Sequence, residues 1–276
     1  MKLRILSALF LLSILVVSCT AEDENDGFNI HNPRISNEID RIADDVSILV
    51  EQEFLGRQAD AGRISSNETS LPVCASVTTT DENGIWTSVI DFGPVGCTLT
   101  SGALISGKII ASGSSDFTSE TFQVNYTFVD FQYNGRNVAG SRHITFSRQS
   151  TTAQTELHLV ADMDLDLTVL FPNGKSYVRS GHRIRKQISG YQTPGDWLDN
   201  VYQITGSWVT AFPNRDLNAT VTDPVIWFGG CPYIGQGKIT YNMGSTTALL
   251  DYGDGICDYF ALLTINAESP ETVLLN

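Results

Sequence analysis

An alternating run between residues 157 and 171, apolar at every odd position and mostly polar at the even ones, constrains the fold of this chain most strongly. The apolar positions are Leu157, Leu159, Ala161, Met163, Leu165, Leu167, Val169 and Phe171, and the polar positions between them are His158, Asp162, Asp164, Asp166 and Thr168, after Glu156. Successive side chains of a β-strand point to opposite faces of the sheet. This period of two therefore predicts a long strand with one buried and one wet face.

The residues after this strand predict a hairpin and its register. Asn173-Gly174 is a dipeptide that two-residue type I′ turns prefer, so Pro172 is expected to pair with Lys175. In that register Asp164 faces Arg183, Asp162 faces Arg185, Thr168 faces Arg179 and Val169 faces Val178. The carboxylates are then expected to form cross-strand ion pairs on the wet face, in preference to a cation site or a general acid.

A second hairpin is predicted upstream. Its first strand alternates as Phe122, Val124, Tyr126 and Phe128 and then, out of phase, as Val129, Phe131 and Tyr133. A phase slip inside a strand predicts a β-bulge. Asn134-Gly135 then turns the chain into a strand over residues 138–146. The aromatic side chains are expected to fill a sheet core, the alternative being that they line a ligand cavity.

The segment 33–56 has the period of an amphipathic helix instead. Its apolar residues recur every three or four positions, at Ile35, Ile39, Ile42, Val46, Leu49 and Val50. Asn32 is a candidate N-cap, Pro33 suits the first turn, and Gly56 is a candidate stop. We expect the helix to pack on its own domain, the alternative being a partner-binding helix. The polar stretch from Arg57 to Ser70 is expected to be a loop.

These patterns together predict an all-β fold class. We expect a β domain over residues 70–276 that is an antiparallel meander of long hairpins, forming a sandwich or half-open barrel, with one N-terminal amphipathic helix packed on it. The length is suitable for a single domain of this kind.

The first nineteen residues are predicted to be a targeting segment. Lys2 and Arg4 precede an apolar block over residues 5–17, which is too short to span a bilayer of roughly 30 Å. Val16-Val17-Ser18-Cys19 resembles the lipobox of bacterial lipoproteins. The resemblance implies that a signal peptide, residues 1–18, is cleaved and that Cys19 carries acyl chains such as palmitate, which anchor the protein in a membrane. The alternative is an ordinary signal peptide with an incidental cysteine.

An acidic segment follows this cysteine. Residues 19–32 begin with four carboxylates among residues 20–26, a composition that predicts a solvated tether. The segment also resembles the export signal of surface lipoproteins of the Bacteroidota. That resemblance implies an outer-membrane protein, lipid-anchored and exposed at the cell surface.

Charge excludes one class of partner. The chain has 17 Lys and Arg against 31 Asp and Glu, a net charge of -14. A protein this acidic repels phosphate backbones, so nucleic acid is not an expected partner. The membrane is expected as a partner through the lipid anchor, and a protein, a glycan or an apolar ligand stays open.

The other four of the five cysteines are expected to form disulfides. An even number in an exported chain allows three pairings, and pairing of sequence neighbours gives Cys74–Cys97 and Cys231–Cys257. The rival interpretation is a four-thiolate metal site. No pair of these cysteines has the two-to-four-residue spacing that zinc sites usually show.

No motif assigns catalysis or a cofactor. His143, His158 and His182 lie in the β region outside any nucleophile, zincin or phosphate-loop context. We therefore name no catalytic residue, and an enzyme of unknown reaction is the least favoured class. A Ca²⁺ site is one candidate for Asp251, Asp254 and Asp258. The favoured interpretation of these residues is a turn in which glycines take positive φ and aspartates cap backbone amides.

Several short sequence segments resemble those of a family of Bacteroidota lipoproteins with no assigned activity. They are Ile90–Gly93, Gly107–Ile110, Asn173–Lys175, Trp197–Gly206, Cys231-Pro232 and Asp251–Asp258, and the resemblance covers about residues 70–266. It implies location and architecture, and the chain departs from it by continuing past Asn266. The expected function is that of a surface binding or structural module. The alternatives are a carrier of an apolar ligand inside a curved sheet and an enzyme.

Overall fold

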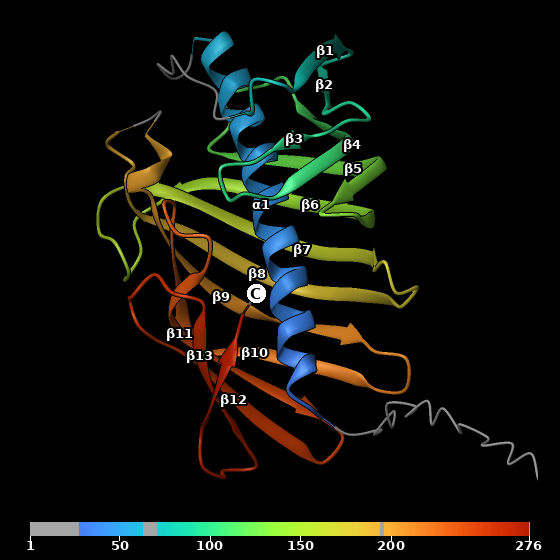
Figure 1. Cartoon of the computed structure of the whole chain (residues 1–276). Helices are drawn as coiled ribbons and strands as arrows, with labels where there is room; N and C mark the ends of the chain where they lie inside the picture. Colours follow the sequence, from blue (N-terminus) through green and yellow to red (C-terminus); the bar gives the residue numbers. More distant parts are fainter. Residues whose placement is uncertain (1–27, 63–70, 194–195, 276) are drawn as a thin grey trace, which may run out of the picture.

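The computed structural model describes residues 28–62, 71–193 and 196–275. The predicted signal peptide, Cys19 and most of the predicted tether lie outside these ranges. Within them the chain forms one open 14-stranded antiparallel sheet and one long helix (Figure 1). The predicted meander of hairpins with an N-terminal helix is confirmed.

The strands follow one another across the sheet in chain order, except that the short β3 pairs only with β4. They are β1 (Ser76–Glu82), β2 (Ile85–Asp91), β3 (Cys97–Thr98), β4 (Leu104–Ser114), β5 (Thr121–Tyr133), β6 (Arg136–Gln149), β7 (His158–Leu170), β8 (Ser176–Ser189), β9 (Val201–Ala211), β10 (Asp216–Phe228), β11 (Ile234–Met243), β12 (Thr246–Asp254), β13 (Phe260–Ile265) and β14 (Glu271–Leu274). A 3-10 turn, η1 (Trp197–Asp199), precedes β9.

Helix α1 (His31–Asp60) crosses the strands on the inner face of the curved sheet (Figure 1). Its side chains are covered on almost every side, and within it only His31, Arg34 and Asp60 are exposed. The apolar stripe of the helix joins the buried residues of the first half of the sheet in one core cluster. In the described ranges every strand belongs to this one sheet, so α1, and not a second sheet, covers its inner face.

The aromatic face of β5 is packed, as expected. The Phe54 ring of α1 stacks on Phe146 with ring centroids 4.9 Å apart and lies 5.2 Å from Phe122. Phe117 lies 6.5 Å from Phe54 on the same side. Because each buried aromatic ring removes a large apolar area from water, these contacts hold the C-terminal half of α1 against the sheet.

The ends of α1 differ from the prediction. Asn32 is not the N-cap, because Ile30 precedes the first turn and the Asn32 Oδ1 accepts a hydrogen bond from the Asn29 amide at 2.6 Å. Gly56 does not stop the helix. Arg57 pairs with Glu53 at 2.9 Å and with Asp60 at 3.0 Å, and such pairs, together with packing on the sheet, offset the roughly 1 kcal/mol that a helical glycine costs.

The predicted features of the β5–β6 hairpin are confirmed. Asn134 and Gly135 have φ angles of 48° and 74°, and Tyr133 pairs with Arg136, as a two-residue type I′ turn requires. The β4–β5 register shifts between Val129 and Gln132, which places a bulge where the alternation slips.

The Asn173-Gly174 hairpin is one residue out of the predicted register. The Gly174 amide donates to the Phe171 carbonyl at 2.9 Å, so Pro172 and Asn173 are the central residues of the turn. Gly174 has a φ of 81°, whereas Asn173 is not among the residues with positive φ. Proline fixes φ near −65° and favours the second position of a type I turn, and a left-handed glycine completes that loop. The two Asn-Gly dipeptides thus form different turns. Pro172 before Asn173-Gly174 selects the type I turn, whereas Tyr133 before Asn134-Gly135 allows the type I′ turn.

The shift by one residue overturns the predicted ion pairs between β7 and β8. Asp164 lies opposite His182 and Asp162 opposite Ile184, while Arg179, Arg183 and Arg185 lie opposite Leu167, Met163 and Ala161, and Val169 lies opposite Tyr177. The carboxylates stay on the wet outer face, and the arginines point inward. Leu165 and Leu167 remain buried, because the slip displaces β8 and leaves β7 in place.

Both predicted disulfides are present. Cys74–Cys97 and Cys231–Cys257 each join Cα atoms 5.8 Å apart, across sequence separations of 23 and 26 residues. The second bond ties the loop before β11 to the loop before β13.

Removal of the second disulfide by the double change Cys231→Ser, Cys257→Ser should lower the free energy of unfolding by about 3 kcal/mol, because the unfolded chain regains the freedom of a closed loop. Urea denaturation of the variant and the parent measures this difference. Peptide mapping under non-reducing conditions checks the pairing. Free thiols, or a peptide linking Cys74 to Cys231, would contradict it.

Candidate functional site

Three arginines of β8 are buried inside the fold together with carboxylates of α1. Arg179, Arg183 and Arg185 share the inner face of the strand, since they are an even number of positions apart. They meet carboxylates of α1 that lie about 140 positions earlier in the chain; Arg179 and Asp40 are separated by 139. Both partners of this contact are polar, so neither the alternation nor the helical period predicts it.

The ion pairs between β8 and α1 follow the same order along both elements. Asp40 accepts hydrogen bonds from both Arg179 and Arg183, and Arg183 also donates to Asp44 at 3.1 Å. Two turns further along α1, Arg185 pairs with Glu51. The Ser36 and Ser47 hydroxyls accept hydrogen bonds of 2.8 Å from Arg179 and Arg185.

Aromatic rings of the neighbouring strand β9 cover the arginines. The Arg183 guanidinium carbon lies 4.0 Å from the centroid of Trp208, and that of Arg179 lies 5.4 Å from the same ring. Arg185 lies 5.1 Å from the ring of Tyr202. The guanidinium groups are therefore held between carboxylates and aromatic faces, an arrangement that stabilises a buried cation.

Other carboxyls of α1 are also withdrawn from water. Burial raises the pKa of Glu53, against the opposing effects of a 2.6 Å hydrogen bond from the Ser88 hydroxyl and the charge of Arg57. Burial likewise raises the pKa of Asp45, which accepts hydrogen bonds from Tyr133 at 2.6 Å and Ser101 at 2.7 Å. Each of these carboxyls contacts a different strand or loop, so the cluster fixes the axial position of α1.

The buried cluster of arginines and carboxylates has a structural role. A buried ion pair adds little net stability compared with an apolar pair, but removal of one partner leaves a charge uncompensated in a medium of low dielectric. Such pairs discriminate against other registers of α1 along the sheet, because a shift by one helical turn would separate every pair at once.

The change Asp40→Ala should lower the free energy of unfolding by about 3–5 kcal/mol, because Arg179 and Arg183 then lose the carboxylate that they share. Asp60→Ala, on the exposed last turn of the same helix, is the matched control and should change it by no more than about 0.5 kcal/mol. Thermal and urea unfolding measure both. A loss of less than 1 kcal/mol for Asp40→Ala would contradict the assignment.

The three histidines of the β region, as the structure describes them, do not form a recognisable site. His182 lies between Asp164, at 3.2 Å, and Asp162, at 3.4 Å. His143, on the far side of Asp164, contacts Asn125 at 2.8 Å. His158 is buried against the Glu156 carbonyl at 2.7 Å. Among the residues that the structure describes, no three His, Cys, Asp or Glu side chains are grouped to hold a metal ion.

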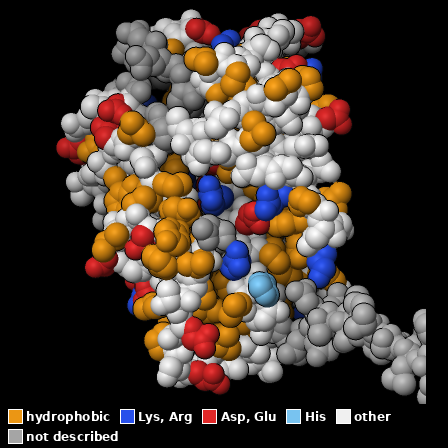
Figure 2. Space-filling model, in the orientation of Figure 1, with side chains coloured by type: hydrophobic (Ala, Val, Ile, Leu, Met, Phe, Trp, Pro, Cys, Tyr) orange, Lys and Arg blue, Asp and Glu red, His pale blue; other side chains and the backbone are white. Residues whose placement is uncertain are grey.

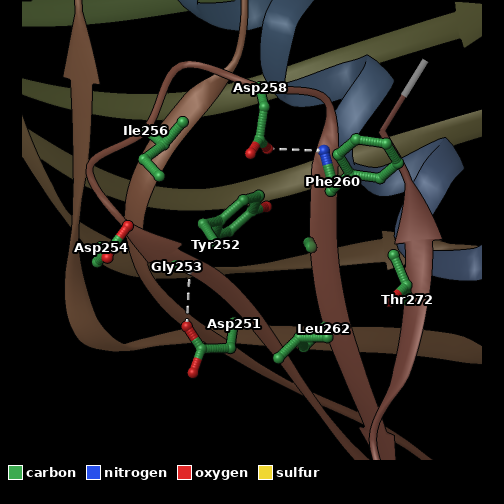
Figure 3. Close-up of a pocket in the computed structure, with 10 residues that line it drawn as sticks. Asp251, Tyr252, Gly253, Asp254, Ile256, Asp258, Phe260, Leu262 and Thr272 are labelled. Carbon is green, nitrogen blue, oxygen red and sulfur yellow. Dashed lines mark hydrogen bonds between the residues drawn. The ribbon is translucent and has the colours of Figure 1, made fainter.

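A hollow of about 430 Å³ opens at the outer end of β12 and β13 (Figure 3). The ladder between these strands stops at the pair Asp251 and Leu262, and the chain then loops out before it returns at Phe260. The lining residues are Asp251, Tyr252, Gly253, Asp254, Ile256, Asp258, Phe260, Ala261, Leu262 and Thr272. The hollow combines apolar side chains with all three carboxylates of the candidate Ca²⁺ site.

The three carboxylates do not converge on one point (Figure 3). Asp251 accepts a hydrogen bond from the Gly253 amide at 3.0 Å and pairs with Lys238 at 3.1 Å. Asp258 accepts one from the Phe260 amide at 2.9 Å. Gly253 and Gly255 have φ angles of 90° and 110°. Two of the aspartates thus cap amides in a glycine-containing turn, which is the arrangement that the turn interpretation predicts.

This loop should be indifferent to calcium, because carboxylates that point apart supply too few of the six to eight oxygens that Ca²⁺ requires. Isothermal titration calorimetry with CaCl₂ should give no saturable heat below 1 mM for the parent or for Asp254→Asn. Saturable binding by the parent that the variant loses would instead establish a cation site.

Comparisons with protein-family models, with curated proteins and with solved structures found no match to this chain. Across the described ranges of the chain, no helix has the length and apolar character that crossing a bilayer requires.

Proposed function

We propose that the protein is a lipoprotein of the outer membrane, anchored by Cys19 at the cell surface, and that it acts as a binding or structural module. The support is the sequence Val16-Val17-Ser18-Cys19 after a basic start and an apolar block, followed by an acidic segment. The resemblance to a family of Bacteroidota lipoproteins favours the same location and adds no activity.

The occupation of the inner face by α1 is the observation that favours a binding module over a carrier. A carrier of an apolar ligand needs a continuous apolar cavity of several hundred Å³ within the curved sheet. Here Phe54, Ile42 and Val46 of α1, all buried, fill the inner face in front of β5 and β6. Partners would then meet the outer face and the loops.

The described residues also give little support to an enzyme. The inner arginines contact carboxylates, hydroxyls and rings of the protein itself, and the outer histidines contact neighbouring side chains. Two of the histidines lie beside a threonine hydroxyl, His143 with Thr145 at 3.4 Å and His158 with Thr151 at 3.2 Å, and the sequence places neither pair in a recognised nucleophile motif. A binding module accounts for the same residues without a reaction.

Intact-mass analysis of the membrane-extracted protein tests the anchor. We expect a chain that begins at Cys19 and is heavier than its sequence by the mass of its acyl chains, because a multiply acylated cysteine holds a protein stably in a bilayer. Cys19→Ala is the control. This variant should carry no acyl groups and should be absent from the membrane fraction. An unacylated parent protein that begins at another residue would contradict the proposed anchor.

A further inference from the structure

A contiguous group of exposed apolar side chains surrounds the hollow at β12 and β13. We call it the C-terminal patch: Ile256, Tyr259, Phe260, Leu262 and Leu274, which are 65%, 41%, 42%, 45% and 44% exposed. Figure 2 shows hydrophobic side chains gathered beside α1 at this end of the sheet. Isolated exposed apolar residues are ordinary, but contiguous ones mark interaction sites.

Strand pairing makes the patch one surface. Phe260 lies opposite Leu274, and directly opposed residues of neighbouring strands point to the same face. Leu262 is two positions from Phe260 and shares that face. Tyr259 and Phe260 have ring centroids 4.3 Å apart. The patch therefore extends from the hollow across β13 to β14, which suits an extended ligand better than a compact one.

The charge around the hollow is negative. Asp251, Asp254 and Asp258 line it, and Asp251 pairs with Lys238 at 3.1 Å, so the lining keeps an excess of negative charge. A site of this kind attracts a positive group that carries apolar surface, and it repels phosphate and carboxylate. The anionic face of a membrane and a second copy of this acidic chain are both disfavoured for the same reason.

We propose that the hollow and the C-terminal patch bind an extended peptide segment of another protein, in which a lysine or arginine stands beside an aromatic or aliphatic residue. The basic side chain would enter the hollow among the carboxylates, and its neighbour would pack on Phe260 and Leu262. Apolar anchors in the centre of an interface supply most of its affinity, while exposed charge pairs supply orientation and selectivity. The inference rests on the proposed function as a binding module and specifies its site and ligand class.

A phage-displayed library of random 12-residue peptides, selected on the full mature chain in detergent, supplies the probe. We expect the enriched peptides to share a basic residue within three positions of an aromatic or aliphatic one. Fluorescence anisotropy of one labelled enriched peptide then measures its Kd. Enrichment of acidic or wholly polar peptides, or of none, would overturn the proposal.

Two variants and two matched controls locate the site. Leu262→Ser should weaken peptide binding about tenfold, and Asp254→Asn about two- to fivefold, the latter effect being the size expected for one exposed charge pair. Leu104→Ser and Asp81→Asn, exposed residues at the opposite end of the sheet, should leave the Kd unchanged. Thermal unfolding of each variant checks that it folds, and Asp254→Asn gives a test that does not alter the apolar surface.

The outcomes separate this inference from the proposed function. Peptides that bind equally to the parent, Leu262→Ser and Asp254→Asn would overturn the C-terminal patch as their site, yet they would leave a binding module in place. Loss of affinity in Leu104→Ser or Asp81→Asn to the same extent as in the patch variants would also overturn it. Intact-mass analysis of the membrane-extracted protein decides the anchor independently of the peptide-binding results.

Discussion

The packing of α1 against the inner face of one open sheet is the contact on which the rest of the structure depends. The 14-stranded sheet, whose strands follow chain order apart from β3, has an apolar face, and the described residues form no second sheet to cover it. The 30 residues of α1 cross this face, with Phe54 among aromatic rings at one end and Asp40 between two arginines nearer the other. Apolar burial supplies most of the favourable free energy, and the ion pairs select one position of the helix.

The sequence predicts local features well and distant pairings poorly. The type I′ turn at Asn134-Gly135, the bulge and both disulfides follow from neighbouring residues. The register of β7 and β8 does not, because Pro172 moves the turn by one residue. The burial of the β8 arginines cannot be predicted from the sequence either, because an arginine in a strand with polar neighbours is normally expected on the solvent face. Asp40, the buried partner of Arg179, is 139 positions away.

For the candidate site, the sequence predicts the glycine-containing turn and its capping aspartates but not the apolar surface beside them. Asp251, Asp254 and Asp258 surround two glycines in a loop tied by Cys257, and all three line one hollow. The apolar side chains beside them come from β13, and their exposure depends on where the ladder with β12 ends. With the inner face filled by α1, the outer face and its loops are the surfaces left for a partner. We propose that a partner binds at the hollow and the C-terminal patch, where carboxylates and exposed apolar side chains lie together.

Hydrogen exchange of the backbone amides tests the central role of α1 most directly. If the helix is the core of the sheet, amides between Ile39 and Phe54 open only when the whole domain unfolds, and they exchange as slowly as those of β6, β7 and β8. Mass spectrometry of exchanged peptides from the native protein should place these segments together in the slowest class. Exchange of the Ile39–Phe54 peptides at least a hundredfold faster than the central strands would show that the sheet is stable without its helix.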